Sequence, residues 1–242
     1  MKKLLCSALI FLTAAVSLTA ATAYKVGSWN EYKYYNEDNT FGAMKMSVVG
    51  QEGSAFWVET VTSGITGMKS KEKNIVKMLI SADKEKSEVK RMIVQTGTEP
   101  AKEMPANMMK MMGGKGSGAS LEEMKNLKEF YAKKGKDEVE ITEKDNVTVK
   151  VPAGTFKTKY TRIIDKKANR TIELYFSESL LPAGIIKSLM NKKVQMELIK
   201  YGGKGAKSEI TGKVEKTEMP NMPNMQEMMK QMNQPEEEGS EE

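Results

Sequence analysis

The stretch VTVKVPAGTFKTKY, residues 147–160 of a 242-residue chain, predicts a β-hairpin. Valines at every second position alternate with polar residues before the turn, and the same period continues after it, as in half-buried strands. Pro152 fixes φ at the second position of a type I turn, and Gly154 can adopt the left-handed conformation that follows it. The stretch therefore favours two antiparallel strands and a β-rich fold.

Alternation of the same kind extends through most of the chain. Between residues 27 and 97 it predicts a five-strand antiparallel meander, because β-branched and aromatic residues are too frequent there for helices. A second Pro-Ala-Gly turn, Pro182–Gly184, follows the hairpin. The strands predicted after the meander are 138–142, 147–151, 155–160, 171–177, 194–201 and 208–217. Counted by alternation, the fold class is mainly β, with about ten strands.

Residues 98–120 interrupt this pattern with prolines, a methionine cluster and a glycine-rich run. We expect a flexible loop, because loops longer than about 15 residues inside a domain are usually functional or disordered. Ser120 and Glu123 then have the spacing of a capping box, which predicts a helix over 120–134 before Gly135. The apolar residues on one face of this helix are Leu121, Met124, Leu127, Phe130 and Tyr131. This one main helix should therefore pack on the sheet.

Residues 1–23 have the pattern of a secretory signal peptide. Two lysines precede an apolar run over Leu4–Leu18, and Ala21–Ala23 supplies the small-x-small pattern for cleavage at about Ala23, before Tyr24. The apolar run is short for a bilayer span. We expect an exported protein, periplasmic or secreted, with no transmembrane segment after signal cleavage.

Between the signal and the C-terminal tail the sequence indicates no domain boundary. Residues 24–217 are therefore predicted to form a single β-rich domain. Residues 218–242 form a Met-rich tail that contains prolines and ends in five glutamates after Pro235. Such a segment has too few bulky apolar side chains to fold alone, so we predict a disordered tail.

The composition excludes several classes of chemistry. The chain has no His, which excludes Ser-His-Asp catalysis and His-ligated metal or haem sites. Its one Cys, Cys6, lies in the predicted signal and leaves no disulfide framework or CxxC site. Lys and Arg are spread evenly rather than clustered with aromatics, which argues against nucleic-acid binding. We expect a protein that is not an enzyme and has no cofactor.

Three short motifs carry a resemblance to a known family. They are VPAGTF at 151–156, YFS at 175–177 and LPAGIIK at 181–187. With the predicted signal and meander, they make the chain similar to an uncharacterised branch of the lipoprotein-carrier (LolA/LolB-like) superfamily, most clearly over 140–200. The resemblance implies a curved half-barrel sheet closed by helices, with a concave apolar face that receives acyl chains. The chain differs from the carriers in its Met-rich loop and tail and in having one predicted helix rather than several.

These observations predict a non-enzymatic exported protein that binds a hydrophobic or lipid-like ligand on the concave face of the sheet. The partner is a lipid or acylated ligand, with peripheral contact to the envelope, and the process is envelope lipid or lipoprotein handling. Alternation does not tell which face is concave, and the candidate residues would serve equally as plain core. The candidate lining residues are Phe56, Trp57, Met78, Leu127, Tyr131 and Phe156.

The methionine clusters support an alternative function. Thioethers are soft ligands that select Cu(I) or Ag(I), and in a chain without His they are the only soft ligands after signal removal. The candidate metal ligands are Met108, Met109, Met111, Met112, Met222, Met225, Met228, Met229 and Met232. Met-rich segments also form adaptable apolar contact surfaces, so a structural envelope protein whose tail docks a partner is a third hypothesis.

Overall fold

The structure is a computed structural model, and it describes residues 24–36, 40–64, 72–82, 87–105, 131, 138–180 and 182–216. The predicted signal peptide at 1–23 and tail at 218–242 lie outside these ranges. The same holds for most of the loop 98–120 and for the helix 120–134 apart from Tyr131. These elements therefore stay predictions.

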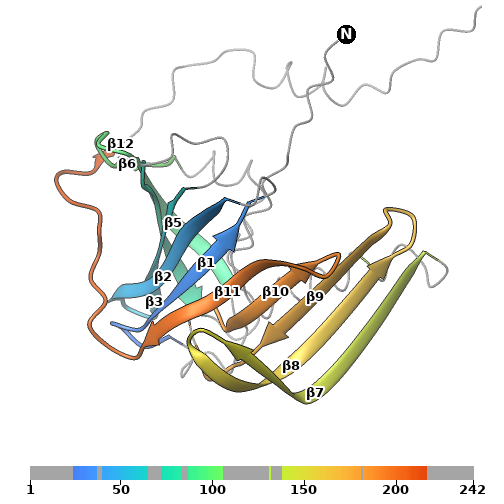
Figure 1. The fold of residues 1–242 in the computed structure, drawn as a ribbon. Helices are drawn as coiled ribbons and strands as arrows, with labels where there is room; N and C mark the ends of the chain where they lie inside the picture. Colours follow the sequence, from blue (N-terminus) through green and yellow to red (C-terminus); the bar gives the residue numbers. More distant parts are fainter. Residues whose placement is uncertain are drawn as a thin grey trace, which may run out of the picture.

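The strands of the described residues are β1 (Trp29–Tyr35), β2 (Phe41–Glu52), β3 (Ala55–Ser63), β4 (Asn74–Ala82), β5 (Ser87–Thr96), β6 (Lys102–Glu103), β7 (Val139–Val151), β8 (Gly154–Asp165), β9 (Arg170–Phe176), β10 (Ile185–Met190), β11 (Lys193–Gly202) and β12 (Glu215–Lys216). They form one open, curved sheet in the order β12-β6-β5-β4-β3-β2-β1-β11-β10-β9-β8-β7 (Figure 1). Among these strands every neighbouring pair is antiparallel except β12–β6. The mainly β class and the curved antiparallel sheet are confirmed.

The predicted meander is also confirmed, since β1 to β5 are consecutive neighbours in the sheet. Three predicted strand assignments differ from the structure. The segments 138–142 and 147–151 are parts of the single long strand β7, and β10 was not predicted. Within 208–217, the described residues place only Glu215–Lys216 in a strand.

Local irregularities explain two of these differences. In β7 the register shifts between Lys144 and Val147, and Asn146 has a φ of 59°, which Asn tolerates better than most residues. The bulge lets one strand continue through a polar segment that resembles a turn in the sequence. In β10 a register shift between Ile185 and Lys187 leaves Ile185 and Ile186 both buried, so the simple alternation is lost.

The predicted hairpin at Pro152–Ala153 is confirmed and closes one end of the sheet. Val151 pairs with Gly154, whose φ is 137°. The backbone N–H of Ala153 donates a hydrogen bond to the carbonyl of Leu198 on β11, at 3.2 Å. Because β7 and β11 are not neighbours in the sheet, this contact shows that the β7–β8 end curls back toward the centre of the sheet.

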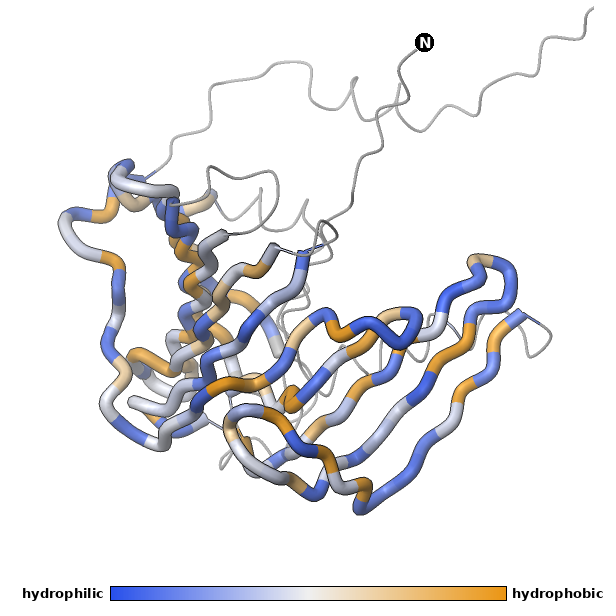
Figure 2. Tube along the Cα trace, viewed as in Figure 1, coloured by the Kyte–Doolittle hydropathy of each residue, from blue (hydrophilic) through white to orange (hydrophobic). Residues whose placement is uncertain are grey.

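The two faces of the sheet bury different clusters, because successive side chains of a strand point to opposite faces. Figure 2 shows hydrophobic and hydrophilic residues alternating along the strands. The larger cluster unites β1–β5 with β9–β11, so it lies on the face toward which the sheet curves, and we call it the concave cluster. Its buried residues are Tyr24, Tyr32, Met44, Met46, Val48, Val58, Met78, Ile80, Val151, Phe176, Leu180, Ala183, Ile185, Ile186, Met196 and Leu198.

The opposite, convex face of β1–β5 is crossed by residues 203–216, which we call the C-terminal strap. Figure 1 shows this segment running from the end of β11 to β12. Its backbone is attached at both ends: Ala206 N–H donates to Gly27 O at 2.9 Å, and Glu215 N–H donates to Ala101 O at 2.8 Å. Ile210 of the strap packs against a second, smaller apolar cluster on this face.

Candidate functional site

The concave cluster is built from rows of side chains that cross neighbouring strands. Met46 on β2 pairs with Asn30 on β1 and with Thr60 on β3. In a further row, Val58 on β3 pairs with Met78 on β4. The buried methionines of the cluster are Met44, Met46, Met78 and Met196. Their unbranched thioether side chains are among the groups that fill this face.

Three of the predicted lining residues come together on this face. Met78 belongs to the concave cluster, and Phe56 and Phe156 are half-buried against it. The ring centroid of Phe56 lies 5.5 Å from that of Tyr24. The ring of Phe156, from the β7–β8 hairpin, meets Tyr201 edge-on with centroids 5.8 Å apart. Strands from both ends of the sheet therefore contribute to one apolar surface.

The other predicted lining residues do not join this cluster. Trp57 follows Phe56 on β3 and points to the convex face, where it belongs to the cluster under the C-terminal strap. Tyr131 is 2% exposed and packs with Val139 and Ile163 in a separate cluster. Leu127 lies outside the described residues.

Buried polar residues on the concave face were missed by the sequence analysis. Tyr32 is fully buried, and Asn30 and Thr60 are 1% and 3% exposed. Asn30 and Tyr32 lie in an alternating segment that the sequence identifies as a strand, but alternation alone assigns polar side chains to solvent. Only the strand register places Thr60 in the same row as Asn30.

Within the part of the chain that the structure describes, these three residues have buried polar atoms without hydrogen-bond partners: Asn30 Nδ2, Tyr32 Oη and Thr60 Oγ1. The Oδ1 atom of Asn30 accepts a hydrogen bond from Ala183 N–H at 3.3 Å, which turns the amide NH₂ away from that loop. Burial raises the pKa of the Tyr32 hydroxyl, so this group remains protonated. All three atoms are thus hydrogen-bond donors facing an apolar interior.

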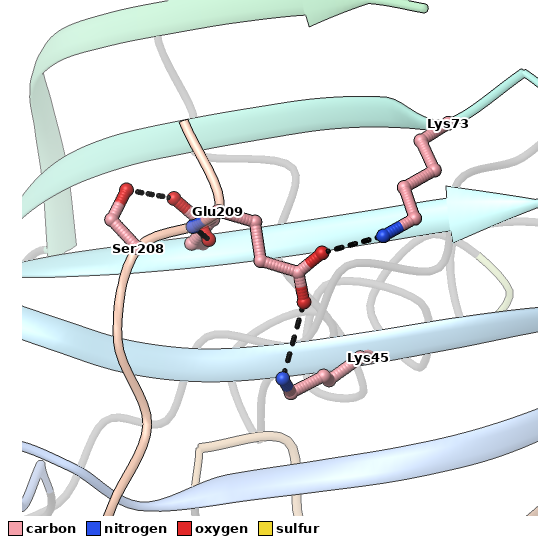
Figure 3. A network of polar contacts seen from close by, with 5 residues as sticks. Lys45, Lys73, Ser208 and Glu209 are labelled. Atoms are coloured by element: carbon pink, nitrogen blue, oxygen red, sulfur yellow. Dashed lines mark hydrogen bonds and ion pairs between the residues drawn. The ribbon is translucent and has the colours of Figure 1, made fainter. Parts of the chain in front are cut away.

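The convex face has a groove of its own, with a cavity volume of about 500 Å³, beside the C-terminal strap. Its polar lining includes Glu31, Lys45, Lys73 and Glu209, and Trp29 forms part of its wall. Glu209 accepts ion-pair contacts from Lys45 at 3.2 Å and from Lys73 at 3.1 Å (Figure 3). Both cations are therefore engaged by the strap.

The strap is held to β3 by the buried carboxylate of Glu59, which is 1% exposed. Glu59 Oε2 accepts a hydrogen bond from Ser208 Oγ at 2.5 Å, and its Oε1 accepts one from Glu209 N–H at 2.7 Å. Lys77 Nζ donates to the same Ser208 hydroxyl at 3.3 Å. Figure 3 labels Ser208 and Glu209, the two strap residues whose hydrogen bonds attach the strap to the sheet.

Trp57 belongs to the apolar cluster against which Ile210 and Val214 of the strap pack. Lys77 Nζ and the guanidinium of Arg91 each lie 5.1 Å from the centroid of the Trp57 ring, within cation–π range. The indole N–H donates to Glu52 Oε1 at 2.9 Å. Trp57 therefore belongs to the convex face and not to the concave cluster.

The metal hypothesis gains no support from the described residues. Among them, no group of three or more His, Cys, Asp or Glu side chains could hold a metal ion. All the methionines proposed as soft-metal ligands lie outside the described ranges. In the same described part of the chain, no helix has the length and apolar character that a membrane crossing requires.

Fold and site together define an open β-sheet protein with an apolar concave face and a strapped convex face. No family model, no curated protein and no solved structure matches the chain. The resemblance to lipoprotein carriers therefore stays a prediction.

Acid is expected to weaken the attachment of the strap. Burial opposes the ionisation of Glu209, but hydrogen bonds from Lys73 and Lys45 outweigh it and hold the pKa of Glu209 below its usual 4.5. A carboxyl whose pKa is lower in the folded state contributes stability that is present above the unfolded-state pKa and is lost as the pH falls through the folded-state pKa. Urea unfolding at neutral pH and at about pH 3.5 measures this loss.

The matched variant is Glu209→Gln, which cannot change its charge. Its free energy of unfolding should be lower than that of the wild type at neutral pH and should fall less between the two pH values. An identical fall in both proteins would show that Glu209 does not contribute to the acid sensitivity.

Proposed function

We propose that the protein is an exported, non-enzymatic binding protein that holds a hydrophobic or lipid-like ligand on the concave face of its sheet, in lipid or lipoprotein handling at the cell envelope. The observation that carries the proposal is the concave cluster, a continuous group of buried apolar side chains shared by both halves of an open curved sheet. Ligand sites are commonly concave, mostly apolar and supplied with few polar groups. The predicted signal peptide at 1–23 supports export.

The proposed site includes the predicted helix 120–134 as its cover. Its support is Tyr131, which is buried against Val139 and Ile163 and is close to Ile172. Ile172 and Phe176 lie four residues apart on β9 and so point to the same face, and Phe176 belongs to the concave cluster. The ligand would lie between this cover and the sheet, stabilised by about 25 cal/mol for each Å² of apolar area removed from water.

Adjacent residues of β3 provide a matched test of the binding face. Phe56 is half-buried on the concave side, and Trp57 lies on the convex side. We expect Phe56→Ala to weaken binding of the hydrocarbon probe diphenylhexatriene about tenfold, because the half-buried ring would lose apolar area in contact with the probe, and a factor of ten represents about 1.4 kcal/mol. Titration of the full chain with the probe, followed by fluorescence, measures the affinity.

Trp57→Ala is the control, and it should leave the probe affinity unchanged even though it lowers stability. Native mass spectrometry of gently purified protein should in addition show co-purifying lipid. A wild-type chain that binds no probe and carries no lipid would overturn the proposed function. Weaker probe binding by Trp57→Ala alone would move the site to the convex face.

A further inference from the structure

Resting on the proposed function, we propose that Asn30, Tyr32 and Thr60 form a polar recognition point on the concave face that binds the neutral ester of an acylglycerol. Each of the three has a side chain that is more than nine-tenths buried and a polar atom without a hydrogen-bond partner among the described residues. Three such atoms in one apolar face point to a ligand that supplies the missing partners.

The strand register brings the three residues into one patch. Asn30 pairs with Met46, and Met46 pairs with Thr60, so Asn30 and Thr60 lie two strands apart, or about 10 Å. Tyr32 lies two residues beyond Asn30 on the same strand and face, or about 7 Å along it. An acylglycerol head, with an ester and two hydroxyl groups, is large enough to span this patch.

The hydrogen-bonding inventory defines what the ligand must offer. The amide NH₂ of Asn30 is a donor only, because its Oδ1 is already bonded to Ala183 N–H. Tyr32 remains protonated and donates through its hydroxyl, and Thr60 can donate in the same way. A buried donor without an acceptor is unfavourable, so an oxygen-rich acceptor group that enters this face removes that penalty. An ester carbonyl is such an acceptor.

The acceptor should carry no charge. The buried residues of the concave cluster, as described, include no Lys or Arg. Lys33, which follows Tyr32, has its Nζ over the rings of Tyr35 and Phe41, and Lys45 and Lys77 contact Glu209 and Ser208 on the convex face. A carboxylate or phosphate buried without a cation has a large desolvation penalty. A neutral ester is therefore favoured over a free fatty acid or an anionic headgroup.

The test compares two ligands that differ only in the ester carbonyl: 1-monooleoylglycerol and its ether analogue, 1-O-oleylglycerol. Displacement of diphenylhexatriene from the full chain gives both affinities. We expect the wild type to bind the ester about five- to tenfold more tightly than the ether, which is the factor that one or two neutral hydrogen bonds supply. Tyr32→Phe and Thr60→Val should each reduce this preference, taken as the ratio of the two affinities within the same variant.

Two control variants each remove a hydroxyl that already has a hydrogen-bond partner. Tyr35→Phe removes a hydroxyl that donates to Glu197 at 2.5 Å, and Thr62→Val removes one that donates to Asn74 O at 3.4 Å. Both should keep the ester preference and lose some stability. Tyr32→Phe and Thr60→Val should instead keep or raise the stability of the ligand-free protein, because each removes an unpaired buried group.

The outcomes separate this inference from the proposed function. If the wild type binds the probe but shows equal affinity for ester and ether, the recognition point is wrong and apolar binding stands. Tighter binding of oleate than of the ester would contradict the inference that the ligand's acceptor group is uncharged. If Tyr32→Phe and Thr60→Val destabilise the ligand-free protein and keep the ester preference, buried water satisfies these groups and the inference fails. Absence of probe binding would remove the proposed function itself.

Discussion

Gly184→Ala is expected to lower the free energy of unfolding by about 3 kcal/mol. A Cβ atom added at Gly184 would lie 2.3 Å from Cε2 and 2.6 Å from Cζ of Phe176, far inside van der Waals contact. Phe176 is 1% exposed in the concave cluster, so its ring has no free space to move into. Gly184 also has a φ of 71°, which a residue with a Cβ adopts only with strain. Chemical denaturation measures the loss.

Gly212→Ala is the matched control, because Gly212 has a φ of 84° and its added Cβ would meet no atom within 4 Å. It should lose about 1 kcal/mol from backbone strain alone. The smaller side chain in Phe176→Leu should make Gly184→Ala less harmful in the double variant than in the wild type. Equal losses at Gly184 and Gly212 would show that the ring contact does not constrain this corner.

The two Pro-Ala-Gly turns show how far the sequence predicts the fold. Both were predicted as turns, and the turn at Pro152–Ala153 forms the predicted hairpin. Their glycines are not equivalent, because a Cβ at Gly154 would lie 3.8 Å from Phe156, an ordinary contact. At Gly184 the constraint comes from Phe176, a residue on the preceding strand whose ring position depends on the whole concave cluster. Local sequence predicts the turn, and tertiary packing decides how strictly its glycine is required.

The sequence likewise predicted only part of the candidate site. Alternation correctly implies that Phe56 and Trp57 point to opposite faces, but it does not identify the concave face, which follows from the curvature of the complete sheet. Polar residues on that face are invisible to a search for apolar positions, so Tyr32 and Thr60 were missed as site residues. Their role depends on which atoms lack a partner, and that property exists only in the folded chain.

At the strap, the sequence pattern predicted a strand that the structure shows only at Glu215–Lys216. Residues 208–217 alternate like a strand, but Ser208 and Glu209 bind the carboxylate of Glu59 instead of pairing with a neighbouring strand. Glu59 lies between Val58 and Thr60 on β3, so its side chain points to the face opposite theirs. A charged residue at such a position is normally expected to face solvent. The strap covers that face, and a carboxylate that is solvated in an isolated strand becomes a buried acceptor.

Glu59→Ala is therefore expected to detach the strap and to lower the free energy of unfolding by about 3 kcal/mol, since two hydrogen bonds to a charged group are lost and their donors remain without an acceptor. Trypsin should then cut the strap after Lys207 and Lys213, both exposed, more rapidly than in the wild type. Denaturation and the rate of proteolysis measure the two effects.

Comparison with other changes separates the buried attachment from a general effect of removing charge. Glu178→Ala removes an ion pair with Lys159 whose two side chains are 42% and 54% exposed, so it should cost less than about 1 kcal/mol and leave proteolysis of the strap unchanged. Ser208→Ala keeps the hydrogen bond from Glu209 N–H to Glu59. Its loss of stability and its rate of strap proteolysis should lie between those of Glu59→Ala and Glu178→Ala. If Glu59→Ala behaves like Glu178→Ala, then the apolar contacts of Ile210 and Val214, rather than the buried carboxylate, hold the strap on the convex face.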